Sequence, residues 1–187
     1  MNRNKFRIYI NAPITICFVL ICLLALGLDY LTNGRSTMLV FSTYGSSLLD
    51  PLAYVRMIGH IFGHAGLNHL VSNMLYILLL GPILEEKYKD RLIIVIITTA
   101  IITGIIHNLV QPNVMLLGAS GVVFAFILLA SITGREQGIP ITLILVAILW
   151  LGQEFYTGAT TADNISQLTH IIGGISGAGL GMFFKKK

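Results

Sequence analysis

The sequence predicts an all-α membrane protein folded as a bundle of six transmembrane helices, and three observations lead to this fold class. Of the 187 residues, 55% are hydrophobic and only 11% are charged, whereas soluble domains carry about 25% charge. Six apolar segments follow one another along the chain. Basic residues recur at the ends of these segments, as they do where helices leave a bilayer. The composition therefore places the chain in a membrane.

The six segments are spans of unequal length in what we expect to be a single domain, residues 1–187. Their approximate bounds are 13–28, 67–84, 92–109, 119–133, 139–152 and 165–184. The first span follows basic residues and ends near Ala25-Leu26-Gly27, so a cleaved signal peptide is an alternative interpretation. We expect the span to be retained, because the rest of the chain is membrane-embedded and can use a first helix.

The fourth span is shorter than the roughly 20 residues that cross the hydrocarbon core. The loop before it, Val110 to Leu117, carries no charge and contains Pro112. Non-helical backbone is tolerated at membrane depth only where protein or water surrounds it. We therefore expect this loop to dip into the membrane.

Residues 30–66 form the longest stretch outside the spans, between the first and the second. The piece from Leu52 to Phe62 sets Arg56 and His60 among apolar side chains. This pattern is typical of an amphipathic segment in the membrane interface. Because a structureless loop of this length is uncommon, we expect a folded interfacial loop.

The lysines and arginines give the orientation of the bundle. With six spans, ten of the 12 basic residues fall on one side, and only Arg35 and Arg56 fall on the other. The positive-inside rule then predicts a multi-pass protein of the cell (plasma or inner) membrane with both termini in the cytoplasm. The net charge of +4 lies at helix ends and forms no patch, which argues against nucleic acid as a partner.

Four polar residues in the second, fourth and sixth spans are predicted to lie at nearly one membrane depth. Ser120 and His170 each lie 15 residues before the basic residue that follows their span, and Asn73 lies 14 residues before the one that follows its own. His69 lies one helical turn before Asn73. At about 1.5 Å per residue, these side chains sit about 20 Å above the cytoplasmic basic residues. Polar residues at such a depth are functional candidates.

The sixth span carries a face of small residues, with Gly173, Gly177 and Gly181 at intervals of four. Such a face lets two helix backbones approach closely in a membrane. We expect it to pack against the fourth span and to bring His170 to Ser120.

Ser120 and His170 have the chemistry of a nucleophile and its base. A serine hydroxyl is a weak nucleophile until a base removes its proton, and histidine titrates near neutral pH. No acidic residue is placed to orient His170, which favours a dyad over a triad. We expect the ring of Phe124, four residues after Ser120, to orient it instead. His69, Asn73 and the Ser120 amide are the candidate donors to an oxyanion.

Three motifs together resemble the rhomboid intramembrane serine proteases in their six-span bacterial form. They are Gly118-Ala119-Ser120-Gly121, His69-x-x-x-Asn73 and His170-x-x-Gly173-x-x-x-Gly177. Each motif alone is weak, but the three in this order and topology are highly specific. The resemblance covers nearly the whole chain.

This resemblance implies a rhomboid-like bundle that hydrolyses peptide bonds in or near transmembrane segments of membrane-protein substrates. It makes Ser120 the nucleophile, His170 the general base, and His69, Asn73 and the Ser120 amide the oxyanion stabilisers. The supporting residues are Gly118, Gly121, Phe124, Gly173 and Gly177.

The resemblance also implies an active site that opens to the outer side and needs neither metal nor cofactor. The implied partners are membrane-protein substrates and the lipid bilayer, and the oligomeric state is left open. Two positions depart from the family pattern. Val55-Arg56 stands where Trp-Arg is frequent, and Phe124 stands where tyrosine often follows the nucleophile.

Other classes remain as alternatives. His60 and His64, with His69 and His107 nearby, are a possible metal site, but the chain has no His-Glu-x-x-His motif. An aspartyl intramembrane protease would need an aspartate inside a span, and no predicted span contains one. A small transporter would have no need of a serine and a histidine matched in depth. A catalytically silent rhomboid-like protein that binds membrane helices is expected to lack Ser120 or His170.

Overall fold

The structure is a computed structural model that describes residues 9–132, 141–160 and 164–184. The chain is all-α, as predicted, and the β contact in these ranges is one isolated bridge between Thr43 and Leu116. The helices are α1 (Pro13–Leu31), α2 (Pro51–Gly59), α3 (Leu67–Tyr88), α4 (Arg91–Val110), α5 (Ser120–Ser131), α6 (Ile141–Thr160) and α7 (Asn164–Phe184). A π-helical turn, η1 (Thr37–Phe41), and a 3₁₀ turn, η2 (His60–Phe62), lie between α1 and α3.

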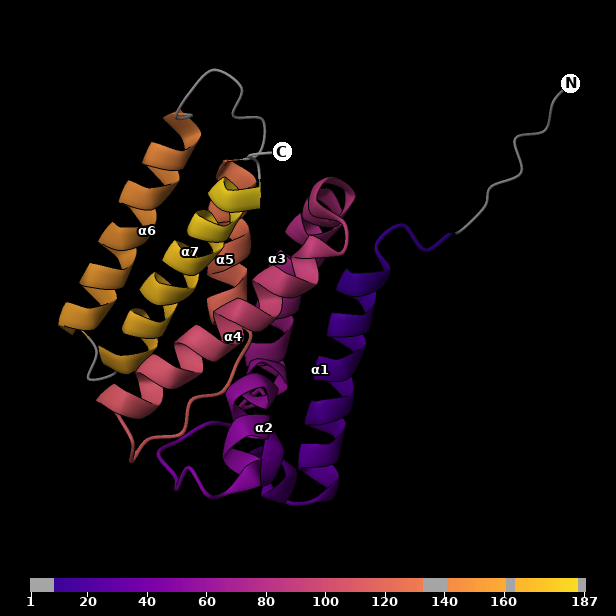
Figure 1. Ribbon diagram of the computed structural model, residues 1–187, viewed down its shortest axis with the longest axis vertical. Coiled ribbons are helices and arrows are strands. Elements are labelled where there is room, and N and C mark those ends of the chain that lie inside the picture. Colours follow the sequence, from indigo (N-terminus) through magenta and orange to yellow (C-terminus); the bar gives the residue numbers. More distant parts are fainter. Residues whose placement is uncertain (1–8, 133–140, 161–163, 185–187) are drawn as a thin grey trace, which may run out of the picture.

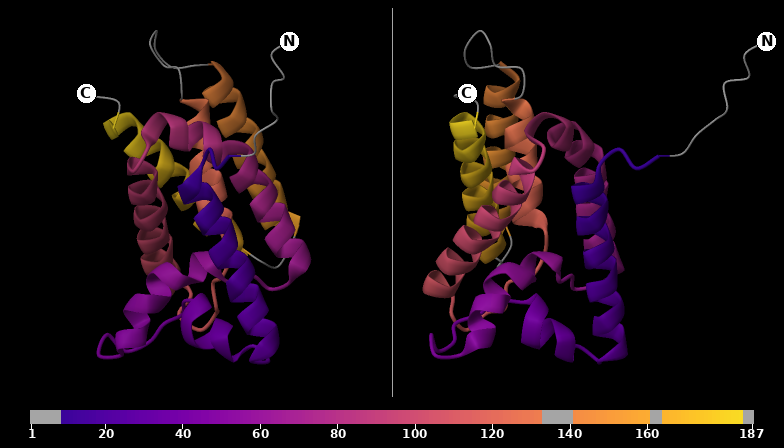
Figure 2. Two further views of the ribbon diagram at one scale, coloured as in Figure 1. Left: turned by 90° about the vertical axis from the view of Figure 1, so that its right-hand side faces the viewer. Right: turned by 45° about the vertical axis from the view of Figure 1, so that its right-hand side comes forward.

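The long helices form one bundle around α5 (Figure 1). Helix α7 packs along α5, α6 packs on the outer side of α7, and α1 packs against α3 at the opposite edge. The start of α1 and the end of α7 lie at the same end of the bundle, whereas α2 lies at the other end (Figures 1 and 2). The loop from α4 to α5 reaches this second end, next to α2.

Three of the described helices, α1, α3 and α4, are long and apolar enough to cross a membrane. Shorter apolar helices run from Ser120 to Ser131 and from His170 to Phe184. Large apolar side chains also cover the outside of the bundle, such as Leu24 with 66% and Leu79 with 61% of its surface exposed. Water would disfavour such a surface, but lipid does not. The chain is an integral membrane protein.

The predicted spans lie on these helices with shifted ends. Helix α1 runs three residues past the expected end at 28, and α6 runs to Thr160 instead of 152. The fourth helix of the sequence-based scheme, α5, has only 12 residues. The predicted ends at 133 and 139, and the basic residues Arg135 and Lys185 used to estimate depth, lie outside the described residues.

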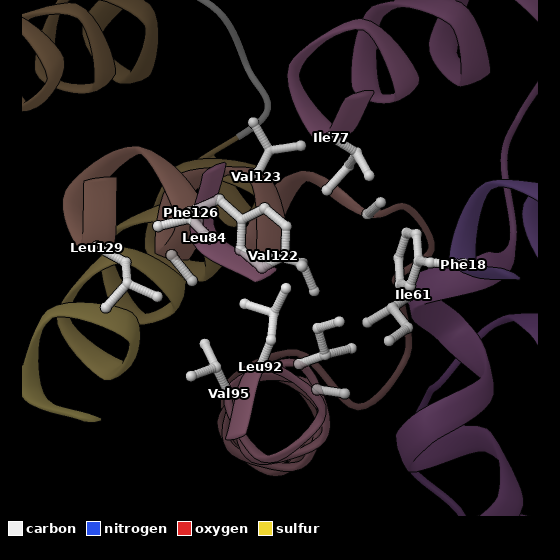
Figure 3. Close-up of a cluster of buried hydrophobic side chains, with 14 of the residues drawn as sticks. Phe18, Ile61, Ile77, Leu84, Leu92, Val95, Val122, Val123, Phe126 and Leu129 are labelled. Carbon is white, nitrogen blue, oxygen red and sulfur yellow. The ribbon is translucent and has the colours of Figure 1, made fainter. Parts of the chain in front are cut away.

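A continuous core joins α1, α3, α4 and α5. Its members are buried apolar side chains, several of which Figure 3 shows converging from different helices. Phe126 and Val122 of α5 meet Leu84 of α3 and Leu92 of α4 at the centre of this cluster. The short α5 is therefore the buried helix that the longer ones surround.

The segment between α1 and α3 is folded, as its composition predicts. Asp50 caps α2 by accepting a hydrogen bond from the Leu52 amide at 3.0 Å. The Arg56 guanidinium is buried, donates to the Asp50 carboxylate at 2.6 Å and lies over the ring of Tyr44. The hydrogen bond from Arg56 holds the pKa of Asp50 below its ordinary value. These contacts fix a segment that contains little regular structure.

Glu85, near the end of α3, caps the beginning of α1. Its carboxylate accepts hydrogen bonds from the Ile14 amide at 2.8 Å, the Thr15 amide at 2.9 Å and the Thr15 hydroxyl at 2.8 Å. The first amides of a helix have no acceptor within it, and the helix dipole favours a negative charge there. Gly81 leaves room for this contact, because a Cβ on it would lie 2.5 Å from Thr15 Cγ2. One buried side chain thus joins two helices.

We predict that Glu85→Gln lowers the free energy of unfolding by about 2 to 4 kcal/mol, because an amide cannot accept on both atoms and loses the charge-assisted bonds. The measurement is denaturation in detergent micelles. The exposed neighbour supplies the control, Glu86→Gln, which should change stability by less than about 0.5 kcal/mol. Equal stability of the two variants would contradict the capping role.

Candidate active site

Ser120 is the first residue of α5, and a non-helical loop, residues 111–119, leads into it. Its backbone N–H therefore has no acceptor within the helix, and it lies at the positive end of the helix dipole. The side chain is half-buried. A hydroxyl and an amide donor are thus available at one residue.

Gly118 lets His69 approach Ser120. Its φ of +127° lies in a region that side chains disfavour. A Cβ on Gly118 would lie 2.9 Å from His69 Nε2 and 3.9 Å from Ser120 Oγ. The imidazole of α3 and the hydroxyl of α5 therefore both border the space that the missing side chain leaves open.

The hydrogen bonding of His69 indicates which ring nitrogen carries the proton of the neutral imidazole: it is Nε2, the nitrogen that faces this space. Nδ1 accepts a long hydrogen bond, 3.4 Å, from the Ala65 amide. A neutral imidazole then carries its proton on Nε2. The ring of His64 meets His69 edge-on, with 5.0 Å between ring centroids. His69 can therefore act as a donor toward Ser120.

Asn73 lies one turn below His69 and is buried. Its Nδ2 donates to the His69 carbonyl at 2.8 Å. An amide nitrogen carries two hydrogens, so this bond orients the group and leaves a second N–H for another acceptor.

Helices α5 and α7 touch through their backbones. A Cβ on Gly173 would lie 2.8 Å from the Gly121 Cα, and one on Gly177 would lie 2.5 Å from the Ala125 Cα. Further along, Gly181 packs against the side chain of Leu129. The predicted contact between the fourth and sixth spans is therefore present. On α5 this contact begins at Gly121, one residue after Ser120. On α7 it begins at Gly173, three residues after His170.

His170 lies against Phe124, as the spacing predicted. The two ring centroids are 4.6 Å apart, with 39° between the ring planes. Because Phe124 follows Ser120 by about one helical turn, its ring sets His170 on the face of α5 that carries the serine.

The loop before Ser120 is held mainly by the segment between α1 and α3. The Gly118 amide donates to the His60 carbonyl at 2.9 Å, and the Gly45 amide donates to Pro112 at 2.8 Å. Thr43 and Leu116 exchange two backbone hydrogen bonds. From α4, His107 Nε2 bonds to the Val114 carbonyl at 2.8 Å.

Three of the histidines considered for a metal site, His60, His64 and His107, contact backbone carbonyls. No group of three or more His, Cys, Asp or Glu side chains with metal-binding geometry occurs in the described part of the chain. His60 instead lies 3.3 Å from the Arg56 carbonyl through Nδ1 and 3.4 Å from the Thr103 hydroxyl through Nε2. His64 Nδ1 bonds to the Phe62 carbonyl at 3.1 Å.

Comparison with known proteins identifies the family. A family model described as "Rhomboid domain" matches residues 51–187. The chain belongs to the rhomboid family.

Several named relatives resemble this rhomboid. It is 33% identical over 135 residues to "Rhomboid-related protein 1" of Caenorhabditis elegans, covering 65% of this chain and 37% of the relative. It is 28% identical over 192 residues to "Rhomboid protease GluP" of Bacillus subtilis, covering 96% and 38%. It is 27% identical over 171 residues to "Rhomboid protease GlpG" of Yersinia pestis, covering 88% and 60%. The chain thus spans between 37% and 60% of the length of these relatives.

Sequence reasoning missed the residues that hold the site from outside it. Thr43 and Asn108 bond to each other from segments 65 residues apart, and neither belongs to a recognisable motif. The sequence signal that could have pointed to such residues is the loop itself, which carries no charge and contains Pro112. These features predicted that protein surrounds the loop.

We predict that Gly177→Leu strongly lowers any peptide cleavage that depends on Ser120 and His170, because a side chain there would push α7 from Ala125 and move His170 away from Ser120. The control is Gly179→Leu on the same helix, since a Cβ on Gly179 has no neighbour within 4 Å. Cleavage assays on the two purified variants, with folding checked by circular dichroism, compare them directly. Wild-type activity of well-folded Gly177→Leu would refute the packing argument.

A second prediction concerns acid. Burial lowers the pKa of both His60 and His64 to about 4 from an ordinary value of 6.5. Between about pH 6.5 and 4 the unfolded chain therefore binds more protons than the folded one, so stability falls as the pH falls. We expect a loss of about 1 to 2 kcal/mol per histidine between pH 7 and pH 5. Denaturation at both pH values, repeated on His64→Gln, should show a smaller pH dependence in the variant. An equal dependence would exclude His64 as a contributor.

Proposed function

We propose that this rhomboid is an intramembrane serine endopeptidase that hydrolyses peptide bonds in or near the transmembrane segments of membrane proteins. The observation that carries the proposal is the meeting of three helices at the start of α5. Ser120 of α5 borders the same space as His69 of α3, and the glycine contact of α7 brings His170 to the same face through Phe124.

The proposed reaction uses Ser120 and His170 as a dyad. His170 takes the proton of Ser120 Oγ as the oxygen attacks the carbonyl carbon of the scissile bond. The tetrahedral intermediate collapses when His170 returns this proton to the leaving amine, and Ser120 keeps the acyl group as an ester. Water, deprotonated by His170, then attacks the ester carbonyl. As this second tetrahedral intermediate collapses, the bond to Ser120 Oγ breaks, His170 returns the proton to Ser120 Oγ, and the acid is released. Proton and bond changes balance without a metal or a cofactor.

The oxyanion of the intermediate would be stabilised by donors that are already oriented. The Ser120 amide belongs to a helix N-terminus, His69 Nε2 carries a proton, and Asn73 keeps one amide hydrogen. Fixed donors of this kind stabilise charge that develops in the transition state, and each is worth about 3 to 4 kcal/mol in characterised proteases.

The loop before Ser120 supports a way for substrate to bind. A peptide bond within a helix has its carbonyl in a hydrogen bond, so the substrate helix must unwind before attack. Leu116 uses one edge of the extended loop to pair with Thr43. Its neighbours Met115 and Leu117 direct their backbone groups to the opposite edge. An unwound substrate can pair with this edge as an added strand.

The orientation in the membrane is part of the proposal. In the six-span scheme, ten of the 12 basic residues fall on one side of the membrane. The start of α1 and the end of α7, which belong to that side, lie at one end of the bundle (Figure 1). This distribution supports cytoplasmic termini and an active site that opens to the outer side.

The test is cleavage of a model transmembrane substrate by the purified protein in proteoliposomes. Ser120→Ala and His170→Ala should each lower kcat by about 1,000-fold or more, because each removes one member of the dyad. Ser131→Ala is the matched control, since its hydroxyl bonds back to the Ile127 carbonyl of the same helix, and it should cleave normally. A chelator should have no effect.

Each other outcome points to a rival. Cleavage that survives either dyad substitution would refute the mechanism, and cleavage lost to a chelator would favour a metal site. Binding of the substrate helix with no cleavage by the wild type would identify a catalytically silent rhomboid-like protein, the second function that the fold supports.

A further inference from the structure

The loop that delivers Ser120 depends on Thr43 more than on any regular element. Thr43 lies in the segment between η1 and α2 and is fully buried. Its amide donates to the Leu116 carbonyl at 2.9 Å, and its carbonyl accepts from the Leu116 amide at 2.8 Å. Leu116 lies four residues before Ser120, and the next attachment, from Gly118 to His60, lies two residues before it.

The side chain of Thr43 is held in turn by the end of α4. Asn108 Nδ2 donates to the Thr43 hydroxyl at 2.9 Å, and the hydroxyl lies 3.2 Å from Asn108 Oδ1, to which it can donate. Asn108 belongs to the last turn of α4, which ends at Val110, where the loop begins. The hydrogen bonds between the two side chains therefore fix the position of Thr43 relative to the start of the loop. The backbone hydrogen bonds of Thr43 to Leu116 in turn fix the position of the middle of the loop.

We propose that Thr43 and Asn108 are positioning residues for Ser120. They touch neither the nucleophile nor the candidate base, and act by fixing the height of the loop against α4. The proposal rests on the proposed function, because it assigns the two residues to the placement of the nucleophile. Small displacements of a nucleophile cost large factors in rate. A small probe that reacts at Ser120 measures such a displacement without pairing with the edge of the loop.

The alternative is that the pair only satisfies two buried polar side chains. The two roles differ in how they respond to removing one partner or both. A single apolar substitution leaves a polar group unpaired and destabilises the fold, whereas two matched apolar substitutions are nearly neutral for stability. The double substitution does not restore the hydrogen bonds between the two side chains. A positioning role therefore predicts that the double variant regains stability but not the rate of reaction at Ser120.

The experiment compares Thr43→Val, Asn108→Leu and the double variant with the wild type, using the rate at which a fluorophosphonate probe phosphonylates Ser120 with loss of fluoride. We expect each single variant to react about three- to tenfold more slowly and to lower kcat by a similar factor. The double variant should regain thermal stability but stay slow. Thr43→Ser, which keeps the hydroxyl, should react at nearly the wild-type rate.

Glu85→Gln is the matched control for destabilisation, because it weakens the opposite end of the bundle. Measured well below its unfolding temperature, it should keep the wild-type rate of phosphonylation. The proposal is overturned if the double variant regains both stability and rate, or if Glu85→Gln and Thr43→Val lose rate in proportion to their loss of stability.

The inference can be judged separately from the proposed function. If the wild-type protein reacts no faster with the probe than Ser120→Ala does, the proposed function fails. Amide hydrogen exchange of the loop then tests the pair by itself. Faster exchange of the Leu116 amide in Thr43→Val would support the proposal that the Thr43 side chain helps to fix the loop. Unchanged exchange would overturn it.

Discussion

The backbone contact between α5 and α7 is the constraint on which the candidate site depends. Helices in a membrane gain little from the hydrophobic effect when they pair, so they associate through close packing of small residues. Gly173 on Gly121 and Gly177 on Ala125 provide this packing. A larger side chain at any of these four positions would push α5 and α7 apart. It would thereby also separate the two candidate catalytic residues, Ser120 and His170. Substrate specificity can vary elsewhere, but this contact must stay small.

A second requirement follows from the loop between α4 and α5. Its backbone polar groups lie beside a buried helix and need partners, because unpaired groups are costly away from water. The segment between α1 and α3 supplies most of them, through Thr43, Gly45 and His60. That segment is therefore folded by its own Arg56 and Asp50 contacts before it can hold the loop.

The fold class and the helical segments could be predicted because they depend on local composition and periodicity. The contact of α5 with α7 could also be predicted, because the glycines repeat every four residues on one helix. The cap of Glu85 on α1 and the pair of Thr43 with Asn108 could not, since each joins residues 65 or more positions apart and neither partner carries a local pattern. For Asn73 the spacing did not predict the hydrogen bond that its side chain donates to the His69 carbonyl.

The cap that Glu85 provides also sets an order of assembly. Helix α1 is synthesised first, and its amides at Ile14 and Thr15 await an acceptor that is made 70 residues later. Until α3 is in place, these amides have no acceptor from Glu85. The attachment of α1 to the bundle at this end therefore requires both helices to be folded and adjacent.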